Sequence, residues 1–279
     1  MRSINVQDVG NAVAEAVIKA NTILPQDVLD ALKRSVGIED AAGRHCLEIL
    51  LENARLAQAQ NLALCQDTGL VVVDLELGQE VRLVGGLLED AVNEGIRQGY
   101  TRGYFRKSVV ESPFKRKNTG DNTPAIIHMQ LTAGDRLKLS ILPKGAGSEN
   151  MGRLVMLKPS QGMAGVKEFV IETVQNAGGN PCPPIIVGVG VGGNMEKAAI
   201  MAKHALLREV GSVNADPDLA ALEKELLTKI NNLGIGPQGL GGKVTALAVH
   251  IETYATHIAC LPVAVSLGCH STRRIVLEF

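Results

Sequence analysis

Apolar runs typical of buried strands alternate with helical segments along almost the whole chain, and this alternation constrains the fold more than any other feature. LVVVDLEL at residues 70–77 and PPIIVGVG at residues 183–190 are short and rich in β-branched side chains, which favours strands. Residues 6–60 instead show apolar spacing close to the 3.6-residue period of a helix. Helices and strands intermixed in this way indicate an α/β fold.

Turn signals predict how these elements are joined. Residues 124–142 contain two strand-like runs separated by Ala-Gly-Asp, which predicts a β-hairpin and therefore antiparallel as well as parallel pairing. Further helices are expected near residues 85–98, 162–177, 194–209 and 217–232. We therefore expect mixed sheets flanked by helices, a helical N-terminal region, and one catalytic domain over residues 1–279, built as one or two lobes.

Charge and hydropathy exclude several classes of function. The formal net charge of −1 at pH 7 leaves no basic excess for a nucleic-acid backbone. No apolar run approaches the ~18 residues that a membrane span requires. The N-terminus lacks the apolar core of a signal peptide, so we expect a cytoplasmic protein. Aromatic residues make up 3% of the chain and Trp is absent, so the core is expected to consist of Val, Leu, Ile, Ala and Met.

Three of the five cysteines lie at the ends of predicted elements, where a ligand can reach them. Cys65 is in CQDTG, Cys182 is in NPCPP and Cys269 is in LGCHS. Cys46 lies within a helical pattern and Cys260 within the apolar run IACLPVAV, so these two are interpreted as small core residues. A reducing compartment disfavours disulfides, and an odd number of cysteines cannot all pair.

The residue pattern alone does not identify what the three loop cysteines bind. The chain has no CxxC pair and no local Cys/His spacing of the structural-zinc kind. An iron–sulfur cluster, a dispersed metal site such as zinc in a non-catalytic assembly subunit, and cysteines without any ligand all remain open at this point.

Two glycine motifs resemble nucleotide-binding loops. Gly188, Gly190 and Gly193 match a dinucleotide fingerprint, but the helix after them is not followed by a strand ending in an acid that would hold a ribose. A nicotinamide-dependent oxidoreductase is therefore a remote alternative. GPQGLGGKV resembles a phosphate loop, but Val244 stands where Ser or Thr would bind magnesium.

Seven segments, in order and spread over nearly the whole chain, carry a family resemblance. They are CQDTG (65–69), KNTGDNTPA (117–125), KGAGSEN (144–150), PCPP (181–184), GVGGN (190–194), GIGPQGLGGK (234–243) and HIACLPVAVSLGC (257–269). Together they resemble the class I fumarase family, and in particular the α subunit of its two-subunit members. These members include fumarate hydratases and L(+)-tartrate dehydratases.

The resemblance implies a cofactor and a set of ligands. In this family three cysteines hold a [4Fe–4S] cluster whose fourth iron has no protein ligand and acts as a Lewis acid. The matching positions are Cys65, Cys182 and Cys269. In the predicted fold, two lobes would enclose this central cluster.

The resemblance also implies which residues contact the substrate. The matching positions are Gln66, Asp67, Arg106, Gly147 and His257. Of these, Asp67 and His257 are the implied catalytic residues. In this family the histidine is contributed across a dimer interface.

The expected activity is reversible hydration of fumarate to (S)-malate, with L(+)-tartrate dehydration as the alternative. Single-chain members of the family have a further C-terminal domain with substrate-binding residues. The chain ends at Phe279 without it, so we expect a separate β subunit and an α2β2 assembly. The expected partners are thus the β subunit and a small dicarboxylate, with no nucleic acid and no membrane.

Overall fold

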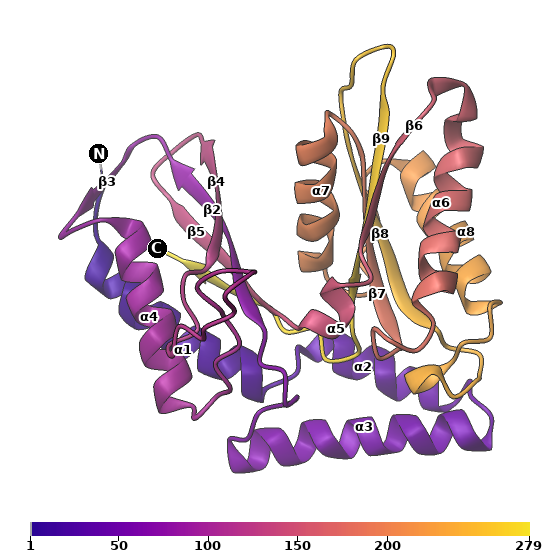
Figure 1. The fold of residues 1–279 in the computed structure, drawn as a ribbon, viewed down its shortest axis with the longest axis horizontal. Helices are drawn as coiled ribbons and strands as arrows, with labels where there is room; N and C mark the ends of the chain where they lie inside the picture. The colour runs from indigo at the N-terminus through magenta and orange to yellow at the C-terminus, as the bar shows by residue number, and fades with distance from the viewer. Residues whose placement is uncertain (1) are drawn as a thin grey trace. The chain divides into compact units, whose positions relative to one another are not determined.

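The chain passes back and forth between two units, a course that the colours of Figure 1 follow. The structure is a computed structural model that describes residues 2–279. Unit 1 contains the residues up to Pro25, residues 53–146 and residues 273–279; unit 2 contains residues 26–52 and 147–272. Each core therefore depends on contacts between residues that are far apart in the sequence.

A four-stranded sheet with two helices on one face forms the body of unit 1. The strands follow the order β10-β5-β2-β4 and are β2 (Leu70–Gly78), β4 (Ile126–Thr132), β5 (Leu137–Lys144) and β10 (Ile275–Glu278). Helices α1 (Val6–Thr22) and α4 (Leu88–Arg102) share a core with alternate residues of these strands, as expected when one face of a sheet is buried. Strands β1 (Arg2–Asn5) and β3 (Val81–Val84) form a separate parallel pair.

The predicted β-hairpin at residues 124–142 is wrong, although both of its strands exist. β2 lies between them, parallel to β4 and antiparallel to β5. Val73 at the centre of β2 pairs with Ile127 on one side and with Ile141 on the other. β2 and β5 thus take the two inner positions of the sheet, where both edges of a strand are hydrogen-bonded and its side chains are largely buried, and this outweighs direct pairing of neighbours in the sequence.

Unit 2 is a sheet with helices on both faces. Its strands follow the order β6-β9-β7-β8 and are β6 (Arg153–Leu157), β7 (Ile185–Gly192), β8 (Ala246–Tyr254) and β9 (Leu261–Gly268). Helices α6 (Gly162–Ala177) and α8 (Pro217–Asn231) pack on one face through a large apolar core. Helix α7 (Met195–His204) packs on the other face of the sheet (Figure 1). There Ala198 and Ala202 meet Ala264.

The predicted α/β class, mixed sheets and helical N-terminal region are confirmed. The N-terminal region forms α1, α2 (Gln26–Val36) and α3 (Ala41–Gln60), and α3 runs across the boundary after residue 52. A short helix, α5 (Ala146–Glu149), lies at the next boundary. In both sheets one strand pair is parallel and the others are antiparallel. Within residues 2–279, no helix has the length and apolar character that crossing a membrane requires.

Close packing of α7 on β7 accounts for the glycines of the dinucleotide-like motif. A Cβ on Gly188 would lie 2.2 Å from the carbonyl oxygen of Ala202, and one on Gly190 would lie 2.1 Å from that of Ala198. Both distances are far below van der Waals contact. Glycine at these two positions therefore lets a helix backbone lie directly on a strand, without requiring a nucleotide.

We predict that Gly190→Ala destabilises unit 2 by about 2–3 kcal/mol, because the new methyl group meets helix backbone that cannot move aside alone. Denaturant unfolding followed by circular dichroism measures this change. Gly37→Ala is the control, since the nearest atom to its Cβ is 3.7 Å away. We expect that variant to stay within ~0.5 kcal/mol of the parent. Equal stability of the two variants would contradict the packing argument.

Candidate active site

The CQDTG segment forms an irregular loop between α3 and β2 in unit 1, and the carboxylate of Asp67 organises it. Oδ1 of Asp67 accepts the backbone N–H of Gly69 at 3.0 Å, and Oδ2 accepts that of Ala146 at 2.7 Å. A Cβ on Gly145 would lie 3.1 Å from the same Oδ2. Asp67 thus joins the CQDTG loop to the start of the KGAG segment, and the absence of a side chain at Gly145 permits the approach.

The other side of the CQDTG loop is fixed through Thr68. Its hydroxyl donates to the carbonyl oxygen of Arg106 at 2.7 Å, and its own carbonyl accepts from the Tyr100 hydroxyl at 2.5 Å. Burial raises the pKa of Tyr100 to about 12, so this hydroxyl remains a donor at any physiological pH. The backbone of Arg106 is therefore held beside the loop, while its side chain is exposed.

The KNTGDNTPA segment also contacts this loop. The amide of Asn122 is completely buried; its Nδ2 donates to the carbonyl oxygen of Gly69 at 3.0 Å. Its Oδ1 accepts the backbone N–H of Ser108 at 2.7 Å. Three of the motifs noted in the sequence, together with Arg106, thus meet in unit 1.

Cys182 and Cys269 are brought together by their neighbours in unit 2. The backbone N–H of His270 donates to the carbonyl oxygen of Cys182 at 3.2 Å. Gln238, from the third glycine loop, donates through Nε2 to the carbonyl oxygen of Pro183 at 2.7 Å and lies 3.0 Å from Nδ1 of His270. Cys182 is exposed and has a left-handed backbone conformation with φ of 56°. Cys182 and Cys269, two of the predicted ligands, therefore lie on adjoining loops.

Buried Glu39, which the sequence interpretation missed, holds the third glycine loop. Its carboxylate accepts the backbone N–H groups of Lys243 at 2.9 Å and of Val244 at 2.6 Å. The amide donors that a phosphate loop would offer to a nucleotide are therefore occupied by an internal carboxylate. No local signal relates Glu39 to this loop, because the contact joins residues more than 200 positions apart.

The two remaining cysteines differ from each other. Cys46 lies in α3 as predicted, but it is half-buried and not in the core; burial, together with the nearby charge of Glu39, raises the pKa of its thiol. Cys260 was expected in the core, and this is wrong: it lies in the loop just before β9 and is half-buried. The apolar run is interrupted there by a turn in which its N–H donates to the carbonyl of His257 at 2.8 Å. None of the five cysteines, all within the described residues, forms a disulfide.

Gly147 and His257 occupy different ends of unit 2. A Cβ on Gly147 would lie 3.4 Å from the carbonyl oxygen of Asn180, two residues before Cys182. His257 is exposed in the loop between β8 and β9. The eight residues of β9 separate this loop from Cys269, a length of about 26 Å. The structure therefore brings Gly147 toward Cys182, but it does not bring His257 toward Cys269.

The three predicted ligand cysteines are divided between the two units. Cys65 is in unit 1, and Cys182 and Cys269 are in unit 2. Over residues 2–279, no group of three or more His, Cys, Asp or Glu side chains is arranged to hold a metal ion. The cysteine assignment therefore stays a prediction.

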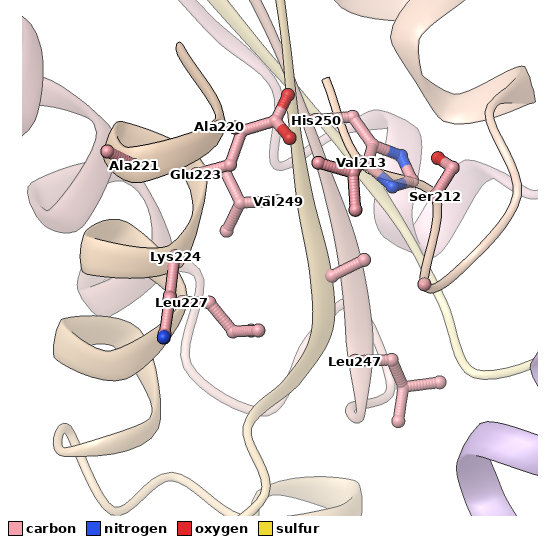
Figure 2. Close-up of a pocket in the computed structure, with 12 residues that line it drawn as sticks. Ser212, Val213, Ala220, Ala221, Glu223, Lys224, Leu227, Leu247, Val249 and His250 are labelled. Atoms are coloured by element: carbon pink, nitrogen blue, oxygen red, sulfur yellow. The ribbon is translucent and has the colours of Figure 1, made fainter. Parts of the chain in front are cut away.

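A pocket of about 420 Å³ in unit 2 has none of the predicted site residues in its lining. Figure 2 shows the residues that line it. Apolar side chains such as Val213, Leu227 and Leu247 line much of it. The carboxylate of Glu223, which lines the pocket, already accepts hydrogen bonds from inside the protein. Its donors are the backbone N–H of Ile251 at 2.7 Å and the side chains of Arg208 and Asn214. The pocket thus offers few free polar groups, and it does not suit a small dicarboxylate.

Comparison with known proteins identifies the family. The sequence model of the family described as fumarate hydratase (fumerase) matches residues 10–278. The chain belongs to this family. The resemblance seen in the motifs is thereby confirmed, and it places the chain among the hydro-lyases, enzymes that add or remove water.

Several relatives in the fumarate hydratase family are similar over nearly their full length. The putative L(+)-tartrate dehydratase subunit alpha of Methanocaldococcus jannaschii is 41% identical over 276 residues, covering 96% of each chain. The L(+)-tartrate dehydratase subunit alpha of Escherichia coli strain K12 is 34% identical over 283 residues, covering 98% of this chain and 93% of the relative. In strain UTI89 the protein of that name is 34% identical over 287 residues, covering 100% and 94%.

We predict that Glu39→Gln lowers the free energy of unfolding by about 2 kcal/mol, because one amide oxygen cannot serve all the N–H donors that the carboxylate accepts. Chemical denaturation measures the loss. Glu168→Gln, on the exposed side of α6, is the matched control and should change stability by less than ~0.5 kcal/mol. An unchanged Glu39→Gln variant would show that Glu39 does not hold the glycine loop.

Proposed function

We propose that residues 1–279 form one catalytic domain, the α subunit of a [4Fe–4S]-dependent hydro-lyase that acts with a separate β subunit as an α2β2 complex. Family membership supports the class of reaction, and the names of the relatives, each an alpha subunit, support a partner subunit. The observation that carries the cofactor proposal is the position of Cys65, Cys182 and Cys269, each of which lies in a loop and outside any disulfide.

The donors present fit such a cluster. Thiolates are its usual protein ligands, and three of them leave one iron open. Cys182 is exposed, and Cys269 lies 3.2 Å from the Ser271 hydroxyl through its sulfur, a contact that a ligating thiolate can keep. When bound, the cluster supplies a Lewis-acidic iron that stabilises the departing hydroxide. The reducing cytoplasm, our proposed location, keeps the thiols available.

Residues of this chain would bind and orient the substrate. Arg106 presents an exposed guanidinium, whose planar fork matches a carboxylate with two parallel hydrogen bonds. Gln66 is exposed beside Cys65 and offers both a donor and an acceptor. Gly147 has no side chain, so the backbone N–H groups of its segment can approach an anion.

Asp67 and His257 would handle protons. Each oxygen of Asp67 accepts one backbone N–H bond, and each keeps a lone pair that can accept a proton or orient a neighbouring hydroxyl. The loop of His257 is separated from Cys269 by the whole length of β9. We therefore propose that His257 serves the site of a second copy of the chain.

The substrate is proposed to be a four-carbon dicarboxylate. The names of the relatives favour L(+)-tartrate. Removing water from it breaks one C–OH bond and takes the proton from the neighbouring carbon, which gives an enol that becomes a keto acid. The alternative is hydration of fumarate to (S)-malate, which the family description, fumarate hydratase, supports. L(+)-tartrate and malate each offer two carboxylates and a departing hydroxyl to the same residues, and in the fumarate direction that hydroxyl is added from water.

The deciding experiment is anaerobic reconstitution of the α–β complex with iron and sulfide, followed by assays with L(+)-tartrate, fumarate and malate. We expect a brown protein with broad absorbance near ~400 nm and water addition or removal on one of these substrates. A complex that takes up stoichiometric zinc, or binds NADH tightly, and shows no such activity would refute the proposal.

Cysteine variants extend the same experiment to the ligand assignment. Serine at position 65, 182 or 269 (Cys65→Ser, Cys182→Ser, Cys269→Ser) should remove most of the bound iron and the ~400 nm absorbance, because a hydroxyl is a far weaker ligand than a thiolate. Cys46→Ser and Cys260→Ser are the controls and should retain both. Loss of iron in Cys260→Ser, with iron retained in Cys269→Ser, would overturn the assignment.

Mixing two inactive variants tests the proposed role of His257. His257→Asn and Cys269→Ser chains, combined and refolded in equal amounts, form mixed dimers with one intact site each. Random pairing should restore about one quarter of the parent activity. Activity that stays at the level of the separate variants would show that His257 acts within its own chain.

A further inference from the structure

Arg273 is a buried cation that the proposed reaction does not yet use. Among the described residues it has the largest fully buried side chain, with 2% of its surface exposed. Its Nη1 donates to Oδ1 of Asn21 at 3.0 Å and to the carbonyl oxygen of Asp67 at 2.8 Å. Both acceptors are neutral.

Within the described residues, no Asp or Glu side chain forms a direct ion pair with Arg273, and its Nε is buried without a hydrogen-bond partner. The carboxylate of Asp67 lies nearby: its Oδ2 and Nη2 of Arg273 lie 3.1 Å and 3.4 Å from the position that a Cβ on Gly145 would take. A buried charge that lacks a direct partner is costly. The hydrogen bond to the Asp67 backbone places this charge beside the Cys65–Gln66–Asp67 loop, where it favours anionic groups.

Arg273 and Asn21 together hold both sides of Cys65. The carbonyl oxygen of Asn21 accepts the backbone N–H of Leu64 at 2.8 Å, and the side chain of Asn21 accepts from Arg273. Arg273 in turn fixes the carbonyl oxygen of Asp67. Leu64 and Asp67, which flank Cys65 and Gln66, are therefore both held by the buried pair of Asn21 and Arg273.

We propose that Arg273 is a positioning residue: its guanidinium fixes the Cys65–Gln66–Asp67 loop, and its charge favours an anion held there. The anion is either the thiolate-bound cluster or a substrate carboxylate. This inference rests on the proposed function for the identity of the anion. The fixing of the loop by itself is independent of any cofactor.

Hydrogen exchange on the full-length chain, with and without reconstituted iron, tests the fixing of the loop. Arg273→Met should accelerate exchange of the peptide covering residues 64–70 about tenfold, because Asp67 loses its anchor and local opening becomes easier. Arg273→Lys should give an intermediate rate, since an ammonium keeps the charge but reaches only one acceptor at a time. The peptide covering residues 183–190 should not change.

The matched control is Arg208→Met, which removes a largely buried guanidinium that pairs with Glu223 in unit 2. It should leave residues 64–70 at the parent rate. Parent-like exchange in Arg273→Met, or equal acceleration in Arg208→Met, would overturn the proposal. If Arg273→Met does not fold, Arg273→Lys decides: parent-like exchange in that variant refutes the role.

Kinetics of the reconstituted α–β complex separate positioning from a general loss of stability. Arg273→Lys should retain its iron, lower kcat about tenfold and change KM less than about twofold. The reason is that the loop positions Asp67, which is proposed to handle protons, whereas Arg106 is proposed to bind the substrate carboxylate. Unchanged kcat would refute the role. If the parent complex takes up no iron, the proposed function fails, while the exchange measurement still decides whether Arg273 holds the loop.

Discussion

Glycine-rich loops leave backbone N–H groups that no helix or strand pairs, and such groups need an acceptor wherever they are buried. In unit 1 the acceptor is the carboxylate of Asp67, which takes one N–H from its own loop and one from the KGAG segment. This interaction links the segment that carries Cys65 to the KGAG segment, next to the point where β2 pairs with the end of β5. The local arrangement of unit 1 at the candidate site depends on it.

In unit 2 a carboxylate also accepts backbone N–H groups of a glycine-rich loop, and here it belongs to Glu39. Glu39 accepts the N–H groups at the end of the third glycine loop, and Gln238 in that loop then reaches the segments of Cys182 and Cys269. A carboxylate acting on backbone N–H groups is stronger than a neutral acceptor, so each loop is held without regular secondary structure. In the third glycine loop, the N–H groups of the phosphate-loop-like segment are accounted for by the carboxylate of Glu39.

The proposed site needs contributions from more than one compact unit of structure. Its three cysteines come from both units, and His257 lies at the far end of β9 from Cys269. The proposed mechanism therefore requires both units, together with the proposed second copy and partner subunit. Within unit 1, Arg273 holds the loop of Cys65 through the carbonyl oxygen of Asp67.

The sequence by itself determined the helices, the loop positions of Cys65, Cys182 and Cys269, and the family. These features depend on local periodicity, turn residues and contiguous motifs, which a short window of sequence contains. Only the tertiary structure decided that β2 separates β4 from β5, that Cys260 lies in a turn, and that Glu39 and Arg273 hold the loops. The physical reason is that strand order and the partners of buried charges are set by the shared core, which joins residues as far as 252 positions apart and leaves no local trace in the sequence.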